Sequence, residues 1–328
     1  MTRSRLTPVT LVTLAFLKKS RTIKPRIIKP MMNPRTVLAI LLLLITTAGP
    51  VAAQTTAAAK PNPQEEKGFT SYAEFGGSSN SDGQVYELNS SVGYNFSQHF
   101  GMDVGVPIYF VHASSSTAGG STSNNGLGNP HVDLRLKFSN PAVNYGSVLT
   151  GWVPTADTKK GLSTGRATFD WTNRFDRSFS RLTPFAEAGI GNTIADSRLF
   201  IRPFTSLGFN AHFQAGANFD LWKFFSVGAS AYDILPSGQQ TIFSKLVKQQ
   251  PGGNSNSSHG RVFENNAQTT GTAAIARDNG YSTWVDASPN RYLDMELGYT
   301  HSVHYALNTV SFSVGVNIGQ LARSGARH

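Results

Sequence analysis

The sequence predicts an all-β fold: an antiparallel transmembrane β-barrel of about 12 strands, with short periplasmic turns and long extracellular loops. Three observations predict it. Large apolar residues alternate with small or polar ones along most of the chain, the connections alternate between short and long, and a secretion signal precedes them. Because strand side chains alternate between two faces, each run has one apolar face for lipid and one polar face for a lumen.

The N-terminal region is typical of an export leader. Arg35 precedes an unbroken apolar run at 37–45, and small residues follow up to Ala53, where we expect cleavage. The apolar run is too short for a transmembrane helix, which needs about 20 residues. The basic stretch before it has no place in such a signal. The expected organisation is a gene-model extension (1–30), a signal peptide (31–53), a periplasmic lead-in (54–68), an outer-membrane barrel (69–319) and a C-terminal tail (320–328).

The net charge of +10 belongs to the leader. Nine of the 29 Lys and Arg residues lie in residues 1–53, which contain no Asp or Glu. The remaining chain therefore has 20 basic and 19 acidic residues. A strongly basic chain would favour nucleic acid as a partner. Because the basic and acidic residues after the leader nearly cancel, we do not expect a nucleic-acid partner.

Alternation justifies the strands in order. It is clearest in six runs, at 86–96, 100–110, 132–138, 209–219, 293–299 and 310–318. In the last run Val310, Phe312 and Val314 alternate with Ser311 and Ser313. We count 11 clear strands, and a single-chain bacterial barrel usually closes with an even number. We therefore predict 12, with the additional strand within 239–247 or 281–286.

The connections favour a barrel over a soluble sandwich, which the alternation alone does not distinguish. Short connections are expected near 97–99, 139–144, 177–182, 220–223 and 301–306. Long ones are expected near 111–126, 154–165, 195–204 and 236–290. The polar 236–290 segment is interpreted as a mobile surface loop, with an inward-folding constriction as the alternative.

Charged residues at every second strand position are expected to line the lumen. They are Asp133, Arg135, Lys137, Asp170, Arg174, Asp176, Asp294 and Glu296. Two readings stay open: a structural ladder of ion pairs, and a functional lining that tunes selectivity. Their slight acidic excess predicts a mild cation preference if the lumen is open.

No catalytic, cofactor-binding or metal site is predicted. His301 and His304 lie in an expected turn with no third ligand nearby, and the chain has no Cys. Gly161 and Gly165 are followed by Arg166, without the Gly-Lys-Ser/Thr ending of a phosphate loop. No spacing selects a Ser, His and acid set. We therefore expect no enzyme activity and no cofactor.

Two loops resemble a loosely defined group of bacterial outer-membrane barrels, the meta-pathway phenol-degradation type and related "transporter" proteins. One loop is Gly-Leu-Gly-Asn-Pro at 126–130, with Asn129 in place of the usual Asp. The other is Pro-Thr-Ala-Asp at 154–157, with Ala156 where Gly is common, followed by Gly-Leu-Ser-Thr-Gly at 161–165. The resemblance implies a barrel that moves small, including hydrophobic, compounds, and it carries over no catalytic residue.

The leading interpretation is a barrel in the bacterial outer membrane that passes or binds a small solute. Its expected partners are outer-membrane lipid, the barrel-assembly machinery and that solute. A structural, adhesive or lipid-ordering barrel without transport is the second interpretation. A barrel-borne enzyme or a soluble periplasmic β-protein is the third.

Overall fold

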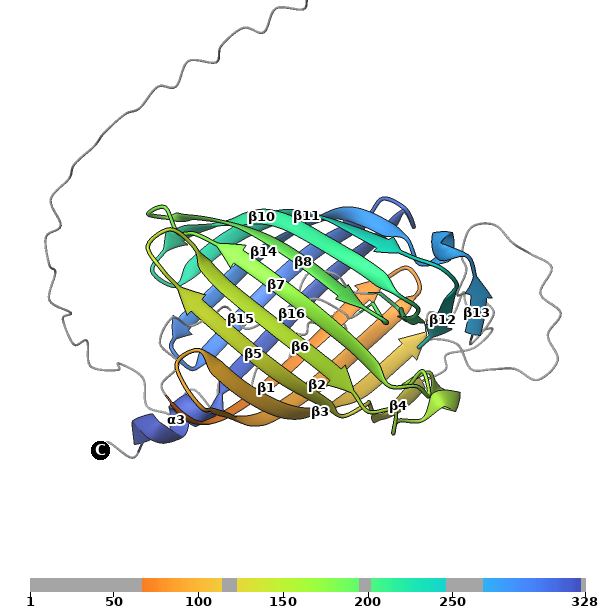
Figure 1. The fold of residues 1–328 in the computed structure, drawn as a ribbon, viewed down its shortest axis with the longest axis horizontal. Coiled ribbons are helices and arrows are strands. Elements are labelled where there is room, and N and C mark those ends of the chain that lie inside the picture. The colour runs from red at the N-terminus through yellow and green to blue at the C-terminus, as the bar shows by residue number, and fades with distance from the viewer. Residues whose placement is uncertain (1–66, 114–122, 195–201, 246–267, 326–328) are drawn as a thin grey trace, which may run out of the picture. The chain divides into compact units, whose positions relative to one another are not determined.

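The computed structural model describes residues 67–113, 123–194, 202–245 and 268–325. The expected leader, its cleavage site and most of the lead-in lie outside these residues. The described chain forms a barrel whose strands cross its axis obliquely (Figure 1). Among the described residues, no helix has both the length and the apolar composition needed to cross a membrane.

Twelve antiparallel strands close the barrel, so the predicted fold and strand number are confirmed. The ring consists, in order, of β1 (Gly68–Asn80), β2 (Gly83–Asn95), β3 (Phe100–Ala113), β5 (His131–Ser139), β6 (Asn144–Trp152), β7 (Thr168–Asp176), β8 (Leu182–Gly191), β10 (Asn210–Trp222), β11 (Phe225–Pro236), β14 (Asp278–Asn290), β15 (Leu293–Ser302) and β16 (Leu307–Asn317). β1 pairs with both β2 and β16, which closes the ring. A short strand, β4 (Ser123–Leu127), extends the sheet beside the end of β3.

Two expectations about the connections were wrong. The segment 236–290 is not one loop, because it contains β14, the additional strand, which includes 281–286. The turn at 303–306 lies at the long-loop end of the ring, although its length suggested the other end. Turn length alone failed there because the side of a turn depends on how many strands precede it.

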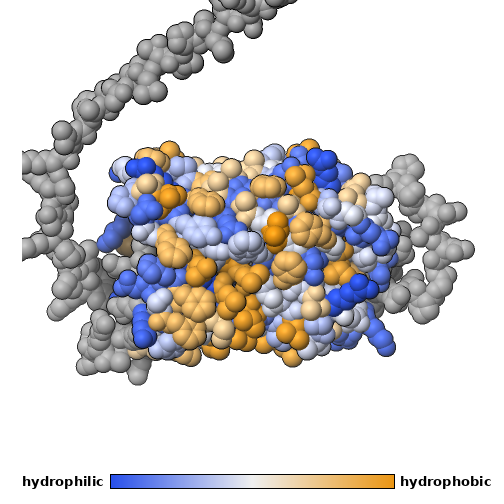
Figure 2. Space-filling model, in the orientation of Figure 1, coloured by the Kyte–Doolittle hydropathy of each residue, from blue (hydrophilic) through white to orange (hydrophobic). Residues whose placement is uncertain are grey.

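The two faces of each strand have the predicted assignment. Along β16, Thr309, Ser311 and Ser313 are buried in the interior, whereas Val310 is exposed on the outside. Figure 2 shows apolar side chains gathered over the barrel wall and strongly hydrophilic ones concentrated toward its two ends. A side-chain period of two therefore separates an apolar exterior from a polar lumen.

A second, three-stranded sheet is formed by the connections at the long-loop end (Figure 1). It contains β9 (Phe204–Leu207), β12 (Gln240–Ser244) and β13 (Gln268–Gly271), with β12 in the centre. Phe204 and Ile242 are fully buried and pack with Ile275 and Tyr305. We call this sheet the cap. The expected mobile loop is thus partly built into the cap, and its residues 246–267 lie outside the described chain.

Within the described parts of the chain, short helices occupy three other places. The 3-10 helices are η1 (Thr158–Lys160) and η2 (Ala273–Ile275), both in connections at the long-loop end. The expected C-terminal tail begins as an α-helix, α3 (Ile318–Gly325), which contacts β1 at the short-turn end.

Candidate functional site: the barrel lumen

All eight charged residues selected from the sequence lie at inward positions of β5, β7 and β15. Glu296 is buried, whereas Asp294, at the short-turn end, is exposed and accepts a hydrogen bond from Ser288 Oγ at 2.7 Å. Their positions fit the predicted face. Their role as a solute lining stays a proposal.

The first interior ion pair joins β5 to β3. Arg135 pairs through Nε with Asp103, and its Nη2 donates to Asn95 Oδ1 at 3.1 Å. Thr70 Oγ1 also donates to Asp103 Oδ1, at 2.8 Å. Gly101 lies opposite Arg135, and a Cβ there would come within 2.5 Å of the Asn95 oxygen. Because Gly101 has no side chain, there is space for the Arg135 guanidinium and the Asn95 amide to meet.

The second interior ion pair joins Arg174 of β7 to Glu187 of β8, and two aromatic rings pack beside it. Arg174 Nη1 donates to Glu187 Oε1 at 2.5 Å, and its Nε lies 3.6 Å from Asp176 Oδ1. The guanidinium carbon lies over the Phe185 ring, 4.0 Å from its centre. The centres of the Phe185 and Trp284 rings are 6.2 Å apart. β8 and β14 are separated by two strands, so these rings meet inside the barrel.

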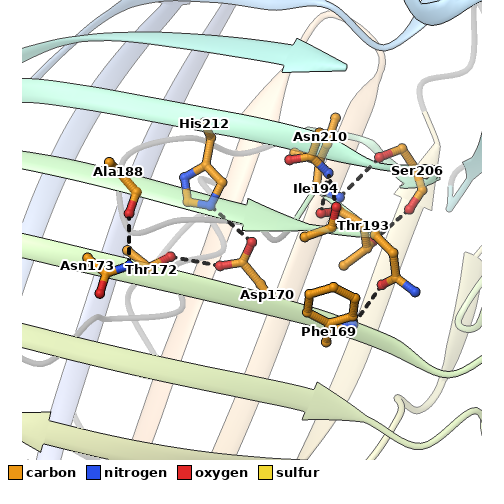
Figure 3. Close-up of polar contacts among 12 residues, drawn as sticks. Phe169, Asp170, Thr172, Asn173, Ala188, Thr193, Ile194, Ser206, Asn210 and His212 are labelled. Carbon is orange, nitrogen blue, oxygen red and sulfur yellow. Dashed lines mark hydrogen bonds and ion pairs between the residues drawn. The ribbon is translucent and has the colours of Figure 1, made fainter. Parts of the chain in front are cut away.

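Two histidines lie beside carboxylates on the same wall. His212 Nε2 is 3.0 Å from Asp170 Oδ1, while Thr172 Oγ1 donates to Asp170 Oδ2 at 2.7 Å (Figure 3). Further around the same inner wall, Asp133 on β5 accepts a hydrogen bond from the Thr150 hydroxyl of β6 and lies near His131. Among the described residues, no group of three or more histidines and acidic residues is arranged to hold a metal ion.

Access of water changes along the lumen. The side chains of the pairs Arg135–Asp103, Arg174–Glu187 and His212–Asp170 are between 9% and 25% exposed. Near the cap, Arg202 is 3% exposed and Asp278 is 0% exposed. Water therefore reaches the wall pairs, whereas it does not reach the Arg202–Asp278 pair near the cap.

A buried polar cluster fastens the cap to the barrel. Arg202, just before β9, lies 3.7 Å from Asp278 Oδ2 at the start of β14 and 5.0 Å from the Phe204 ring centre. Ser302 Oγ donates to Asp278 Oδ1 at 2.6 Å, and the Tyr232 hydroxyl donates to Oδ2 at 3.4 Å.

Tyr305, in the turn between β15 and β16, joins the same cluster. Its hydroxyl donates to the carbonyl of Ile275 at 2.8 Å. Burial raises the pKa of Tyr305 to about 12, and the nearby Arg202 opposes that rise. The hydroxyl therefore remains protonated and able to donate at neutral pH.

The cap also contacts the opposite side of the mouth. At the far end of β12, the Lys245 ammonium lies 5.1 Å from the centre of the Tyr109 ring on β3. β3 is five strands from β14 around the ring of twelve, so the cap bridges the opening. On the barrel side, Asn210 Nδ2 donates to the Thr193 carbonyl and Thr193 Oγ1 to the Ser206 carbonyl of β9 (Figure 3).

The two loops behind the family resemblance contact each other beside the cap. The Ala156 amide donates to Asn129 Oδ1 at 3.1 Å, and Asp157 caps η1 by accepting from the Lys159 amide. An Asp at position 129 would offer the same acceptor. Leu162 is buried in a cluster with Val85 and Val111.

Several residues of the lumen were missed by sequence reasoning. Asp103 lies between the outward Met102 and Val104, so strict alternation would have placed it inside. Glu187 sits in a strand of small residues with weak alternation. Arg202 precedes a strand of four residues, and no periodic signal marks it.

No family model matches the chain, and no curated protein matches it. Among solved structures, the chain is similar to an outer membrane channel from Pseudomonas putida F1, with 9% identity and a TM-score of 0.46, covering 82% of this chain and 97% of that one. It is also similar to the KdgM porin in complex with disordered oligogalacturonate, with 7% identity and a TM-score of 0.43, covering 75% of this chain and 98% of that one. At this similarity they add no argument about function, and the phenol-degradation resemblance stays a hypothesis.

Proposed function

We propose that this chain is a bacterial outer-membrane barrel whose polar lumen binds or passes a small solute. The observation that carries the proposal is the contrast between the two faces of the wall. The outside is apolar, and the inside holds ion pairs that water reaches. This contrast is typical of a barrel that has lipid outside and an aqueous or polar interior.

The exterior supports a membrane location over a soluble periplasmic protein. Leu297 is 56% exposed on β15, and Phe213, Val285 and Leu134 are exposed on three other strands. Apolar surface on every side of a barrel is far more than a soluble monomer exposes. Lipid would cover this surface, and outer-membrane lipid is therefore a proposed partner.

The cap suggests how a solute would use the lumen. The water-accessible pairs lie on the barrel wall, whereas Arg202 and Asp278, which tie the cap to the barrel at the long-loop end, are inaccessible to water. A solute can therefore bind from the short-turn side with the cap in place, and complete passage requires the cap to move. The phenol-degradation resemblance adds small hydrophobic compounds to the candidates.

The aromatic contact inside the barrel supports one other candidate, a barrel without transport. Phe185 and Trp284 are buried where they meet, and ion pairs link the walls around them. In that case the ion pairs stabilise the barrel and play no part in solute selectivity.

Planar-bilayer recording distinguishes the candidates. Among the inward charged residues named above, acidic ones outnumber basic ones: Asp103, Asp133, Asp170, Asp176, Glu187, Asp294 and Glu296 against Arg135, Lys137 and Arg174. We expect a small conductance with a mild cation preference. Replacing Asp170 and Asp176 by Asn should weaken or invert the preference, and Asp157→Asn, outside the lumen, should leave it unchanged.

Two results would contradict the proposal. Background conductance in all proteins, with a lower melting temperature only for the lumen variant, would favour the barrel without transport. Recovery of the native protein in the soluble periplasmic fraction would refute the membrane location.

A further inference from the structure

A group of exposed basic residues occupies one side of the short-turn end. The turns β7–β8, β10–β11 and β14–β15 connect strands that are consecutive in the ring, so they lie next to one another. They carry four exposed basic side chains: Arg177, Arg181, Lys223 and Arg291. We call these four residues the basic arc.

The charges of the basic arc are not neutralised by ion pairs. Among the described residues, the interior cations Arg135, Arg174 and Arg202 each pair with a carboxylate. None of the four arc residues forms an ion pair within the described parts of the chain. Two of them instead lie over exposed rings, Arg177 at 4.9 Å from the centre of Phe179 and Lys223 at 5.2 Å from the centre of Phe224.

Aromatic side chains surround the arc on the outer surface. Trp222 is 72% exposed and Phe179 is 53% exposed, and Phe175 and Phe225 are exposed beside them. Such aromatic side chains are typical of the level where acyl chains meet headgroups. The basic arc thus lies at the depth where lipid phosphates would be.

A cavity of about 430 Å³ opens within the arc. Arg181, Lys223, Trp222, Asp220 and Asp286 are among the residues that line it. The Asp220 amide donates to the Arg181 carbonyl at 2.8 Å, which holds the first turn against β10. Two exposed cations, the exposed Asp220 carboxylate and aromatic carbon therefore face a single space, together with the buried Asp286 carboxylate, which accepts a hydrogen bond from Ser226 Oγ.

We propose that this cavity and the basic arc bind the headgroup of an anionic phospholipid, phosphatidylglycerol. The inference rests on the membrane location in the proposed function. The phosphodiester would lie between Arg181 and Lys223, and the glycerol hydroxyls would donate to Asp220. The ammonium group of phosphatidylethanolamine or phosphatidylcholine would add a cation beside two others, which disfavours those lipids.

Two variants with equal charge changes test the site in the detergent-purified full chain. The arc variant replaces four basic residues by Gln: Arg177, Arg181, Lys223 and Arg291. The control variant replaces four exposed basic residues at the long-loop end by Gln: Lys159, Lys160, Arg166 and Arg277. Heat-modifiable migration on gels confirms that each protein is folded. Native mass spectrometry with equimolar phosphatidylglycerol, phosphatidylethanolamine and phosphatidylcholine measures bound lipid.

We expect wild type and control to bind phosphatidylglycerol preferentially. A basic residue near an anionic surface contributes about fivefold in binding, so the arc variant should lose at least roughly fivefold in the ratio of phosphatidylglycerol to phosphatidylcholine. An equal loss in the control variant would show a general charge effect and overturn the site. A preference of wild type for phosphatidylethanolamine would also overturn it.

Two further results separate this inference from related ones. Displacement of the lipid by soluble glycerol phosphate at equal concentration would assign the cavity to an anionic solute and overturn the lipid proposal. A chain that stays in the membrane fraction but shows no lipid preference would refute only the site. A chain found in the soluble fraction would refute the proposed function itself.

Discussion

Replacing Arg202 by Met should release the cap, because the change leaves the Asp278 carboxylate buried without its cation. Both side chains are almost fully inaccessible to water, at 3% and 0% exposure. Removing one partner of a buried pair costs about 3–5 kcal/mol. The separation of 3.7 Å and the hydrogen bonds from Ser302 and Tyr232 place this pair near the lower limit. A cost of about 3 kcal/mol corresponds to a roughly 100-fold shift toward the open cap.

Hydrogen exchange of the β9 and β12 amides measures this opening, because strand amides exchange when their local structure opens. Arg202→Met should reduce their protection roughly 100-fold, and the barrel strands should keep theirs. Adding Asp278→Asn should restore most of it, since Asn is uncharged, accepts one of the two hydrogen bonds through Oδ1 and can donate from Nδ2 to the other hydroxyl oxygen. In bilayers the single variant should be open more often than wild type. Unchanged β9 protection in Arg202→Met, or no recovery in the double variant, would refute the reasoning.

Two other substitutions test the wall. Phe312→Arg, at the middle of β16 on the outer face, should cost about 2–4 kcal/mol in a bilayer, and Ser313→Arg on the inner face should assemble better. The reverse order in heat-modifiability assays would invert the face assignment. Gly228→Ala would place a Cβ 2.1 Å from the buried ring of Trp284 and should cost about 1–3 kcal/mol, whereas Gly146→Ala has no atom within 4 Å and should melt like wild type. Equal melting temperatures for the two alanine variants would argue against packing of the Trp284 ring on Gly228.

Period-two alternation made the lumen residues predictable one strand at a time. Asp133, Arg135 and Lys137 needed no partner strand for their face to be assigned, because the pleat alone determines it. Their partners were not predictable in this way. Arg174 and Glu187 are 13 residues apart, and whether they meet depends on the register between β7 and β8.

The sequence by itself determined the class of fold, the polarity of the two faces and the candidate lumen charges, because these follow from local alternation and from closure with an even number of strands. Only the tertiary structure decided the cap, the place of β14 and the pairing of Arg202 with Asp278. β9 and β12 are far apart in the chain and too short to show a period. Arg202 lies just before β9, whereas Asp278 is the first residue of β14. Contacts between such segments depend on the closed barrel, which brings their ends to one mouth.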